Sequence, residues 1–350
     1  MRWPPARTLA LLPSMFLLAS CGENTTPTEP EPAGDLPSLH RGLHNRWTEK
    51  APLPGDFAIS GVAAAAVHSK AAGKPIVYVL GGNITGNVAD IFAYNLATNR
   101  WTKQAAQFVG TRTNGIGLIR GKLYISGGYD LSGGDGFCCG SMQRTLYAYD
   151  PAVDRITRKA DMPRQTAEGV TGVIKGKLYV LSGTCTDDSP PVFDCDDPRV
   201  TRLLYRYDPV KNTWITLRAA PHSHEGGVGG VIRGRLYVAG GGNTRHLDVY
   251  NPSTNTWRSL APLPAGRVGA AGAIQDGKLW VFGPSASDAD RRTFVYDPRT
   301  NRWATKASIP VGGAHGAAAS VPDKQSHILL VGGGFRPGDE GPGPSLLYTP

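Results

Sequence analysis

Short runs of hydrophobic residues recur along most of the chain and are separated by turn residues. The stretches IVYVLGG, GKLYISGG, GKLYVLSG, GRLYVAGG, GKLWVFGP and HILLVGG each lead into a pair of small residues. The second member of each pair lies at positions 82, 128, 183, 241, 284 and 333. A self-similar period of about 50 residues indicates a propeller or solenoid built from repeated units.

Each repeat contains four runs that have the length and composition of β-strands. In the third repeat we expect strands at Val170–Ile174, Lys177–Leu181, Leu203–Tyr207 and Thr213–Leu217. Turns of the GK or GR type join the first two runs, and DP or NP turns join the last two. The first run of each repeat is rich in Gly and Ala, which suits the crowded strands around a central axis.

A tyrosine and a tryptophan seven residues apart accompany this pattern in four repeats. The pairs are Tyr94 with Trp101, Tyr207 with Trp214, Tyr250 with Trp257, and Tyr296 with Trp303. With the paired small residues, this pattern resembles the kelch repeat over residues 45–350. The resemblance implies an all-β fold, a six-bladed kelch-type β-propeller with four antiparallel strands per blade.

The two ends of this region supply complementary parts of one blade. Ser345–Pro350 reads as a third strand, and Asn45–Pro54 reads as a fourth strand with no preceding partner. Pairing them would close the ring with the N-terminal outer strand against the C-terminal strands and leave no open seam. We therefore expect six blades, the sixth shared by both ends.

Composition and the first residues place this domain outside the cytoplasm. The 45 Gly and 28 Pro exclude a helical protein. Arg2 and Arg7 precede a short apolar stretch that ends in Leu-Ala-Ser-Cys, which resembles a bacterial lipobox. The alternative is an ordinary secretory signal with a chance cysteine. We expect a signal peptide at 1–20 and lipidation of Cys21.

The segment 21–44 is rich in Pro, Thr and Glu without an apolar period, so we expect a flexible lipidated tether. The lipobox resemblance implies an exported domain anchored in the cell envelope, and Gly22 after the cysteine implies the outer membrane. No other stretch is apolar enough to cross a bilayer. The formal charge of +9 is scattered without a basic run, which argues against nucleic acid as a partner.

Two long insertions follow the second strands of neighbouring repeats and hold the remaining cysteines. These are Cys138, Cys139, Cys185 and Cys195. An oxidising location favours disulfides. Cys185 with Cys195 is the simplest bridge, and two cross-loop pairings are the alternatives. No CxxC spacing or nearby histidine supports a metal site, so we expect neither a metal nor a cofactor.

Polar residues precede the first strand of each repeat, where the chain returns to the central axis. The candidates for a ligand-binding ring at the mouth of the channel are Arg112, Glu168, His224, Glu225, Arg267 and His315. Arginine would bind a carboxylate, and Glu or His would contact hydroxyl groups or transfer protons. The alternative is that wet propeller mouths simply collect polar residues.

Two functions compete for this sequence. Regular repeats without a catalytic signature favour a monomeric binding or scaffold module that presents one face to a protein or glycan partner. The alternative is a carbohydrate-active enzyme of the sugar-acid epimerase or mutarotase type, whose fold is similar and whose acid/base would lie in the mouth. A copper radical site is not expected, because the cysteines lie in the insertions. We expect a binding module rather than an enzyme.

Overall fold

The computed structural model describes ten stretches of the chain. They are residues 44–54, 61–69, 74–82, 88–109, 115–130, 141–183, 200–284, 290–310, 316–332 and 345–350. The chain divides into two compact units, 1–42 and 43–350, and every described residue belongs to the second. In these stretches no helix is long and apolar enough to cross a membrane.

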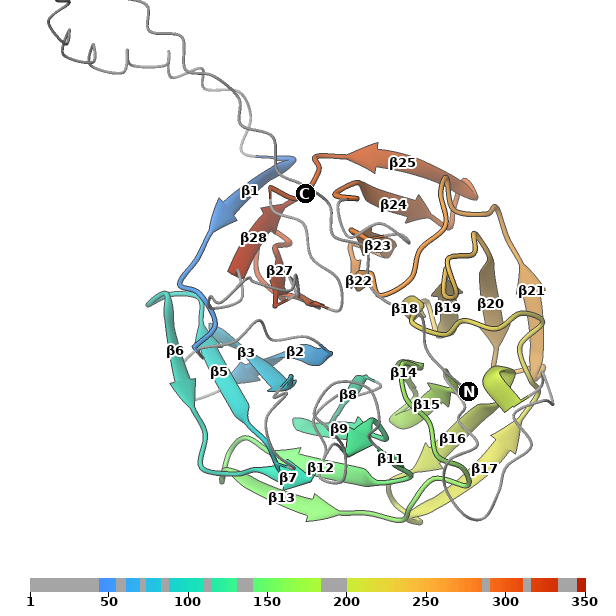
Figure 1. Ribbon diagram of the computed structural model, residues 1–350, viewed down its shortest axis with the longest axis horizontal. Coiled ribbons are helices and arrows are strands. Elements are labelled where there is room, and N and C mark those ends of the chain that lie inside the picture. The colour runs from blue at the N-terminus through green and yellow to red at the C-terminus, as the bar shows by residue number, and fades with distance from the viewer. Residues whose placement is uncertain are drawn as a thin grey trace, which may run out of the picture. The chain divides into compact units, whose positions relative to one another are not determined.

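The described residues form six four-stranded antiparallel sheets arranged as blades around an axis (Figure 1). The innermost strands are β2 (Val62–Ser69), β8 (Ile116–Ile119), β14 (Val170–Ile174), β18 (Val228–Ile232), β22 (Ala271–Gln275) and β26 (Ala317–Ser320). The second strands are β3 (Lys74–Gly81), β9 (Lys122–Ser126), β15 (Lys177–Leu181), β19 (Arg235–Ala239), β23 (Lys278–Phe282) and β27 (Ile328–Val331). The predicted six-bladed propeller is confirmed.

The outer half of each blade carries the aromatic repeat motif. The third strands are β5 (Ile91–Asn95), β12 (Leu146–Asp150), β16 (Leu204–Asp208), β20 (Leu247–Asn251), β24 (Thr293–Asp297) and β28 (Ser345–Thr349). The outermost strands are β6 (Arg100–Lys103), β13 (Arg155–Arg158), β17 (Thr213–Leu217), β21 (Thr256–Ser259), β25 (Arg302–Lys306) and β1 (Arg46–Glu49). In the third blade three strands have the predicted bounds, and β16 begins one residue later than predicted.

The sixth blade combines both ends of the described domain. Its strand order is β1-β28-β27-β26, and Trp47 pairs with Tyr348 across the first two strands. Three shorter elements lie outside the blades' four-stranded sheets. They are the ribbon of β4 (Val88–Ala89) with β7 (Phe108–Val109), the ribbon of β10 (Tyr129–Asp130) with β11 (Ser141–Met142), and the 3-10 helix η1 (Val200–Arg202).

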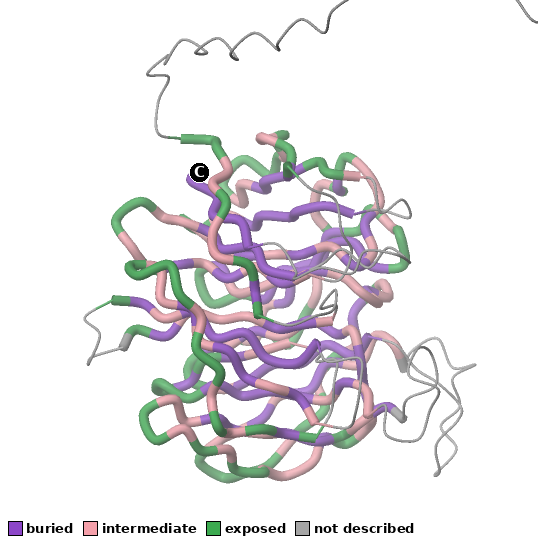
Figure 2. Tube along the Cα trace, turned by 60° about the vertical axis from the view of Figure 1, so that its left-hand side comes forward, coloured by how far each residue is buried: buried purple, intermediate pink, exposed green. Residues whose placement is uncertain are grey.

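The hydrophobic core lies between blades rather than at the centre. Six buried clusters each combine residues of two neighbouring blades, as when Tyr237 of blade four packs with Leu279 of blade five. Figure 2 shows the buried residues concentrated within the strands and the exposed ones at turns and outer edges. Blade-to-blade burial of this kind makes each blade depend on its neighbours for stability.

A repeated hydrogen-bond motif joins neighbouring blades. In blade four the Tyr250 hydroxyl donates to Asn255 Oδ1 at 2.7 Å, and the Arg218 N–H of blade three donates to the same oxygen at 3.1 Å. Trp257 Nε1 then donates to the Arg218 carbonyl at 2.8 Å. We call this Tyr–Asn–Trp arrangement the staple. The sequence pattern indicated the Tyr and the Trp of the staple. Its Asn was not predicted, although the spacing Tyr-x4-Asn recurs in the sequence.

The staple recurs in the other blades. The equivalent tyrosine–acceptor pairs are Tyr94–Asn99, Tyr149–Asp154, Tyr207–Asn212, Tyr296–Asn301 and Tyr348–Asn45. Each acceptor has a left-handed backbone conformation, with φ between 45° and 58°, which Asn and Asp tolerate better than most residues. Blade two departs from the pattern, because it has Asp154 and Ile156 where other blades have Asn and Trp.

Candidate functional site

The blades present two chemically different faces. We call the turn face the side that carries the tight turns between first and second strands and between third and fourth strands, such as Arg233–Gly234. We call the connection face the opposite side, where second strands lead to third strands and each outer strand leads to the next inner strand. In blade four the connection face comprises residues 218–227 and 240–246.

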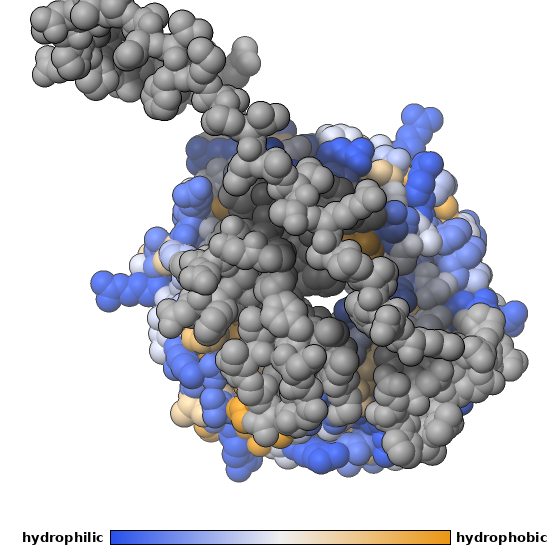
Figure 3. Space-filling model, in the orientation of Figure 1, coloured by the Kyte–Doolittle hydropathy of each residue, from blue (hydrophilic) through white to orange (hydrophobic). Residues whose placement is uncertain are grey.

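A channel lined by the six innermost strands runs along the axis, with a cavity volume of about 460 Å³. Its opening is visible near the centre of Figure 3, where the described rim of the propeller is mostly hydrophilic. None of the described residues that line this cavity is ionisable; they are Gly, Ala, Val, Ile and Leu with Thr171 and Ser320. The described part of the channel wall is thus built from small and apolar residues.

The small residues of the inner strands have a packing reason. A Cβ on Gly172 would lie 2.7 Å from Val231 Cγ2 and 2.8 Å from Leu236 Cδ1, both in the next blade. A real Cβ does not approach another atom so closely, so a larger side chain at this position would push the blades apart. The crowding that the sequence predicted is thus a contact between neighbouring blades.

The structure describes four of the six candidate mouth residues, all on connections that lead from an outer strand to the next inner strand. Arg112 and His315 lie outside the described residues, as do Cys21, Cys138, Cys139, Cys185 and Cys195. The described candidates are Glu168, His224, Glu225 and Arg267, and all lie on the connection face. Glu168 and Glu225 are half-buried, whereas His224 and Arg267 are fully buried.

Glu168 lies at the inner end of its connection, close to the axis. Its carbonyl accepts a hydrogen bond from Gly226 N–H at 2.9 Å, and the Gly226 carbonyl accepts one from Gly269 N–H at 3.0 Å, so the chain of bonds crosses blades three to five. Glu168 has φ 55°, whereas the equivalent positions in blades four and five are Gly. Residues other than glycine rarely adopt this conformation, and those that do are often found at functional sites.

Arg267 is fully buried and is held within blade five. Its Nη1 donates to Asp290 Oδ2 at 2.9 Å and to the Gly266 carbonyl at 2.8 Å, and the guanidinium lies 4.6 Å from the centre of the Phe294 ring. Hydrogen bonding from Arg292, followed by the charge of Arg267, holds the pKa of Asp290 well below its usual range. Arg267 is thus already paired and does not face the channel opening.

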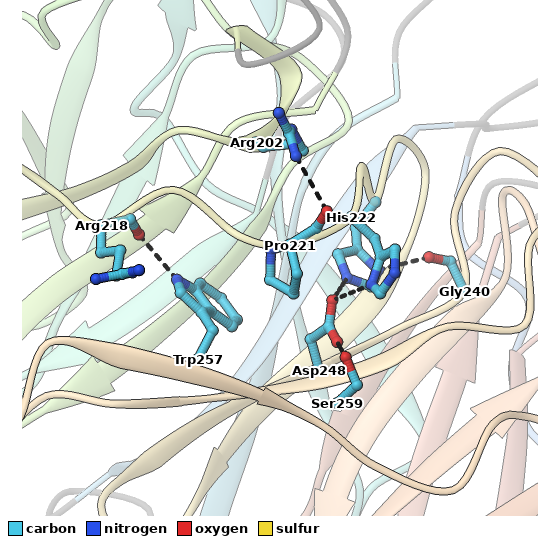
Figure 4. Close-up of polar contacts among 9 residues, drawn as sticks. Arg202, Arg218, Pro221, His222, Gly240, Asp248, Trp257 and Ser259 are labelled. Atoms are coloured by element: carbon cyan, nitrogen blue, oxygen red, sulfur yellow. Dashed lines mark hydrogen bonds and ion pairs between the residues drawn. The ribbon is translucent and has the colours of Figure 1, made fainter.

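His224 occupies the position in blade four that Arg267 occupies in blade five, four residues before the inner strand. It is also fully buried. Its Nδ1 lies 2.7 Å from the Gly240 carbonyl oxygen, and its Nε2 lies 3.0 Å from Asp248 Oδ2 (Figure 4). The same Oδ2 lies 2.9 Å from His222 Nδ1, and Ser259 donates to Asp248 Oδ1 at 2.7 Å.

Asp248 is the centre of this cluster and is itself fully buried. Burial opposes its ionisation, but the hydrogen bonds from His224, Ser259 and His222 outweigh that effect, so the pKa of Asp248 lies below its ordinary value. The ring of His222 in turn stacks on His246, with centroids 3.7 Å apart and planes 5° from parallel. We call His222, His224, His246 and Asp248 the histidine cluster.

Of the histidine cluster, only His224 was predicted from the sequence as a candidate site residue. Asp248 is hidden within an otherwise ordinary third strand, and His222 and His246 lie in two loops that the fold brings together. One signal was available: aligning the third strands shows that Asp248 stands where the other five blades have an aromatic residue or leucine. In the described part of the chain, no group of three or more His, Cys, Asp or Glu is arranged to hold a metal ion.

Comparisons with known proteins agree with this architecture. A family model for the Kelch motif matches residues 226–264, which form most of blade four. Kelch-like protein 35 of Mus musculus is 24% identical over 196 residues, covering 56% of this chain and 29% of that protein. Kelch-like protein terF of Aspergillus terreus is 26% identical over 222 residues, covering 58% and 46%. The chain thus spans less than half the length of these relatives.

Two solved structures share the fold at low sequence identity. YjhT has a TM-score of 0.61 and 17% identity, over 85% of this chain and 95% of that one. A fungal alcohol oxidase of the AA5 family, in complex with copper, has a TM-score of 0.57 and 16% identity, over 87% and 76%. These likenesses show the fold alone. The motif match and the relatives support a kelch-repeat family.

Proposed function

We propose that this propeller is a non-catalytic binding module and that a protein partner binds its connection face. The observation that carries the proposal is the contrast between the two faces. The tight turns between third and fourth strands repeat one staple in blade after blade, whereas the connection face differs between blades in exposed residues such as Pro221, Arg245 and His246. Varied loops on a rigid scaffold are the usual means of recognition. A propeller of the kelch type commonly serves as such a scaffold.

The chemistry on the connection face also favours binding over catalysis. His224, Asp248 and Arg267 are buried and committed to partners in their own blades. The described channel walls carry no ionisable group. Within the same proposal, the domain is exported and held at the bacterial envelope by lipidated Cys21, and the two cysteine-bearing insertions are stabilised by disulfides and belong to the binding surface.

Site-specific photo-crosslinking in cells that make the protein tests which face is used. A photoreactive residue at Arg245 or Arg291, both exposed on the connection face, should yield a discrete cross-linked protein. The same residue at Val153 or Lys211, both exposed on the turn face, should yield none. Equal cross-linking from both faces, or from the turn face alone, would contradict the proposal.

One observation favours a second candidate, a carbohydrate-active enzyme of the sugar-acid epimerase or mutarotase type. The uncommon backbone conformation of half-buried Glu168 puts a carboxyl group near the channel mouth, where a general acid or base would act. Incubation of the full chain with sugar acids, monitored by proton NMR, tests this. Anomer or epimer exchange that Glu168→Gln abolishes would establish the enzyme, and no exchange would remove it.

A further inference from the structure

Asp248 is not required by the propeller fold. It is the second residue of β20, and the second residues of the other third strands are Phe92, Tyr147, Tyr205, Phe294 and Leu346. Five blades thus fill this buried place with an apolar or aromatic side chain, and blade four fills it with a carboxylate. A buried charge is costly unless it is paired. The propeller fold therefore does not require a charge at this place, and blade four departs from the pattern.

The hydrogen bonds of the cluster show which histidine nitrogens are occupied. His224 lies between two acceptors, with Nδ1 at the Gly240 carbonyl and Nε2 at Asp248 Oδ2. His222 Nδ1 lies at the same carboxylate oxygen, and its Nε2 has no hydrogen-bond partner among the described residues. The His222 side chain is 34% exposed.

The stacked pair of His222 and His246 is placed to respond to acid. Partial burial, and then the neighbouring His222, lower the pKa of His246 below its ordinary value. Acidification adds positive charge to two rings that lie 3.7 Å apart. The two oxygens of Asp248 already accept from three donors, so they are not free to accept a further hydrogen bond from the pair.

The surroundings add further positive charge. Arg202, on η1, donates to the carbonyl of Pro221 beside His222, and Arg245 precedes His246 and donates to the Leu263 carbonyl. The other charged groups near the cluster are Glu225 next to His224, and Arg267, which donates through Nη1 to Asp290 on blade five. Among the described residues, Arg202 and Arg245 thus lie beside the pair, so protonation of the pair adds to the positive charge of this surface and suits an anionic partner.

We propose that His222 and His246 form a recognition site for carboxylate groups of an acidic segment in a protein partner, and that acidification strengthens this contact. The inference rests on the proposed binding function and adds the partner's chemistry to it. The unprotonated pair presents acceptor nitrogens and little charge. The protonated pair presents N–H donors that make charge-assisted hydrogen bonds to carboxylates.

Binding of a fluorescent hexaglutamate peptide to the full chain tests the site. We expect the affinity, measured by anisotropy, to be about tenfold higher at pH 5.5 than at pH 7.5, while a hexaglutamine peptide shows no such gain. The double variant His222→Gln/His246→Gln should lose the gain. The matched control is His68→Gln, which removes an exposed histidine from the turn-face end of β2 and should keep it.

A second variant guards against a purely structural effect. The exchange His224→Thr/Asp248→Tyr copies the equivalent residues of blade three, Thr166 and Tyr205, so blade four should stay folded while the histidine pair loses its anchor. A retained melting transition with loss of the pH-dependent gain supports the site.

Three results would overturn the inference. They are an absent gain in the wild type, a gain that survives in His222→Gln/His246→Gln, and tighter binding of a galacturonate oligomer than of the peptide. If connection-face cross-links form and yet the peptide does not bind, the binding module stands and the histidine site fails.

Discussion

The staple, which ties each turn between third and fourth strands to the preceding blade, and the buried polar contacts on the connection face stabilise loops in opposite ways. Both tie a loop to its blade or to the next blade. The staple uses nearly the same three side chains throughout the ring, whereas the connection face uses Thr166 with Ser182 in blade three, a histidine cluster in blade four, and Arg267 with Asp290 in blade five. Uniform chemistry marks what the fold requires, and varied chemistry marks what it leaves open to function.

The largest expected effect comes from breaking the buried ion pair between Arg267 and Asp290 on the connection face. Asp290→Ala leaves the Arg267 guanidinium buried without its anion and should lower the free energy of unfolding by about 3 kcal/mol. Asp297→Ala removes a carboxylate from the exposed ion pair with Arg299 and should cost only about 1 kcal/mol. Urea denaturation of both variants measures the difference. Equal losses would show that the buried pair is not special.

A smaller effect is expected from removing one acceptor of the staple. Asn255→Ala removes the acceptor shared by Tyr250 and the Arg218 N–H, and should cost about 1–2 kcal/mol in thermal or urea unfolding. Asn255→Asp keeps an acceptor oxygen, as blade two does with Asp154, and should cost about 0.5 kcal/mol or less. If both variants lose the same free energy of unfolding, the hydrogen bonds of the staple contribute nothing beyond the packing of Tyr and Trp.

The smallest effect concerns pH and separates blade four from its neighbours. The pKa of His246 is lower in the folded chain than in an unfolded one, so protonation favours unfolding. The stability that neutral His246 contributes is therefore complete above about pH 6.5 and declines as the pH falls below that value. His246→Gln should flatten the melting temperature between pH 7.5 and 5.5. His68→Gln should leave the wild-type decline unchanged, and a steeper decline in His246→Gln would contradict the assignment.

Much of the fold could be predicted because its signals are local and repeated. The paired small residues, the Tyr and Trp of the staple and the Gly and Ala of the inner strands each recur at a fixed place, so one repeat checks another. The bounds of β14, β15 and β17 follow directly from such patterns. Strand alternation and turn chemistry act over a few residues, which is the range that a sequence displays.

The candidate site was harder to predict from the sequence, because its chemistry depends on contacts between segments far apart in the chain. Sequence position alone placed His224 and Arg267 at the channel mouth, yet the structure buries both of them against acceptors that lie 16 to 24 residues away. Glu225 and Glu168, which lie one and two positions closer to the inner strand, are only half-buried. A shift of one residue along a connection decides which way a side chain faces, and periodicity does not determine it there.

The sequence by itself determined the number of blades, their strand order and the places where loops vary, because these follow from repeated local patterns. Only the tertiary structure decided that His222 and His246 stack, that Asp248 holds two histidines, and that Arg267 belongs to Asp290. The reason is physical: hydrogen bonds and ring contacts between loops depend on distances of a few ångströms, and the packing of whole blades sets those distances.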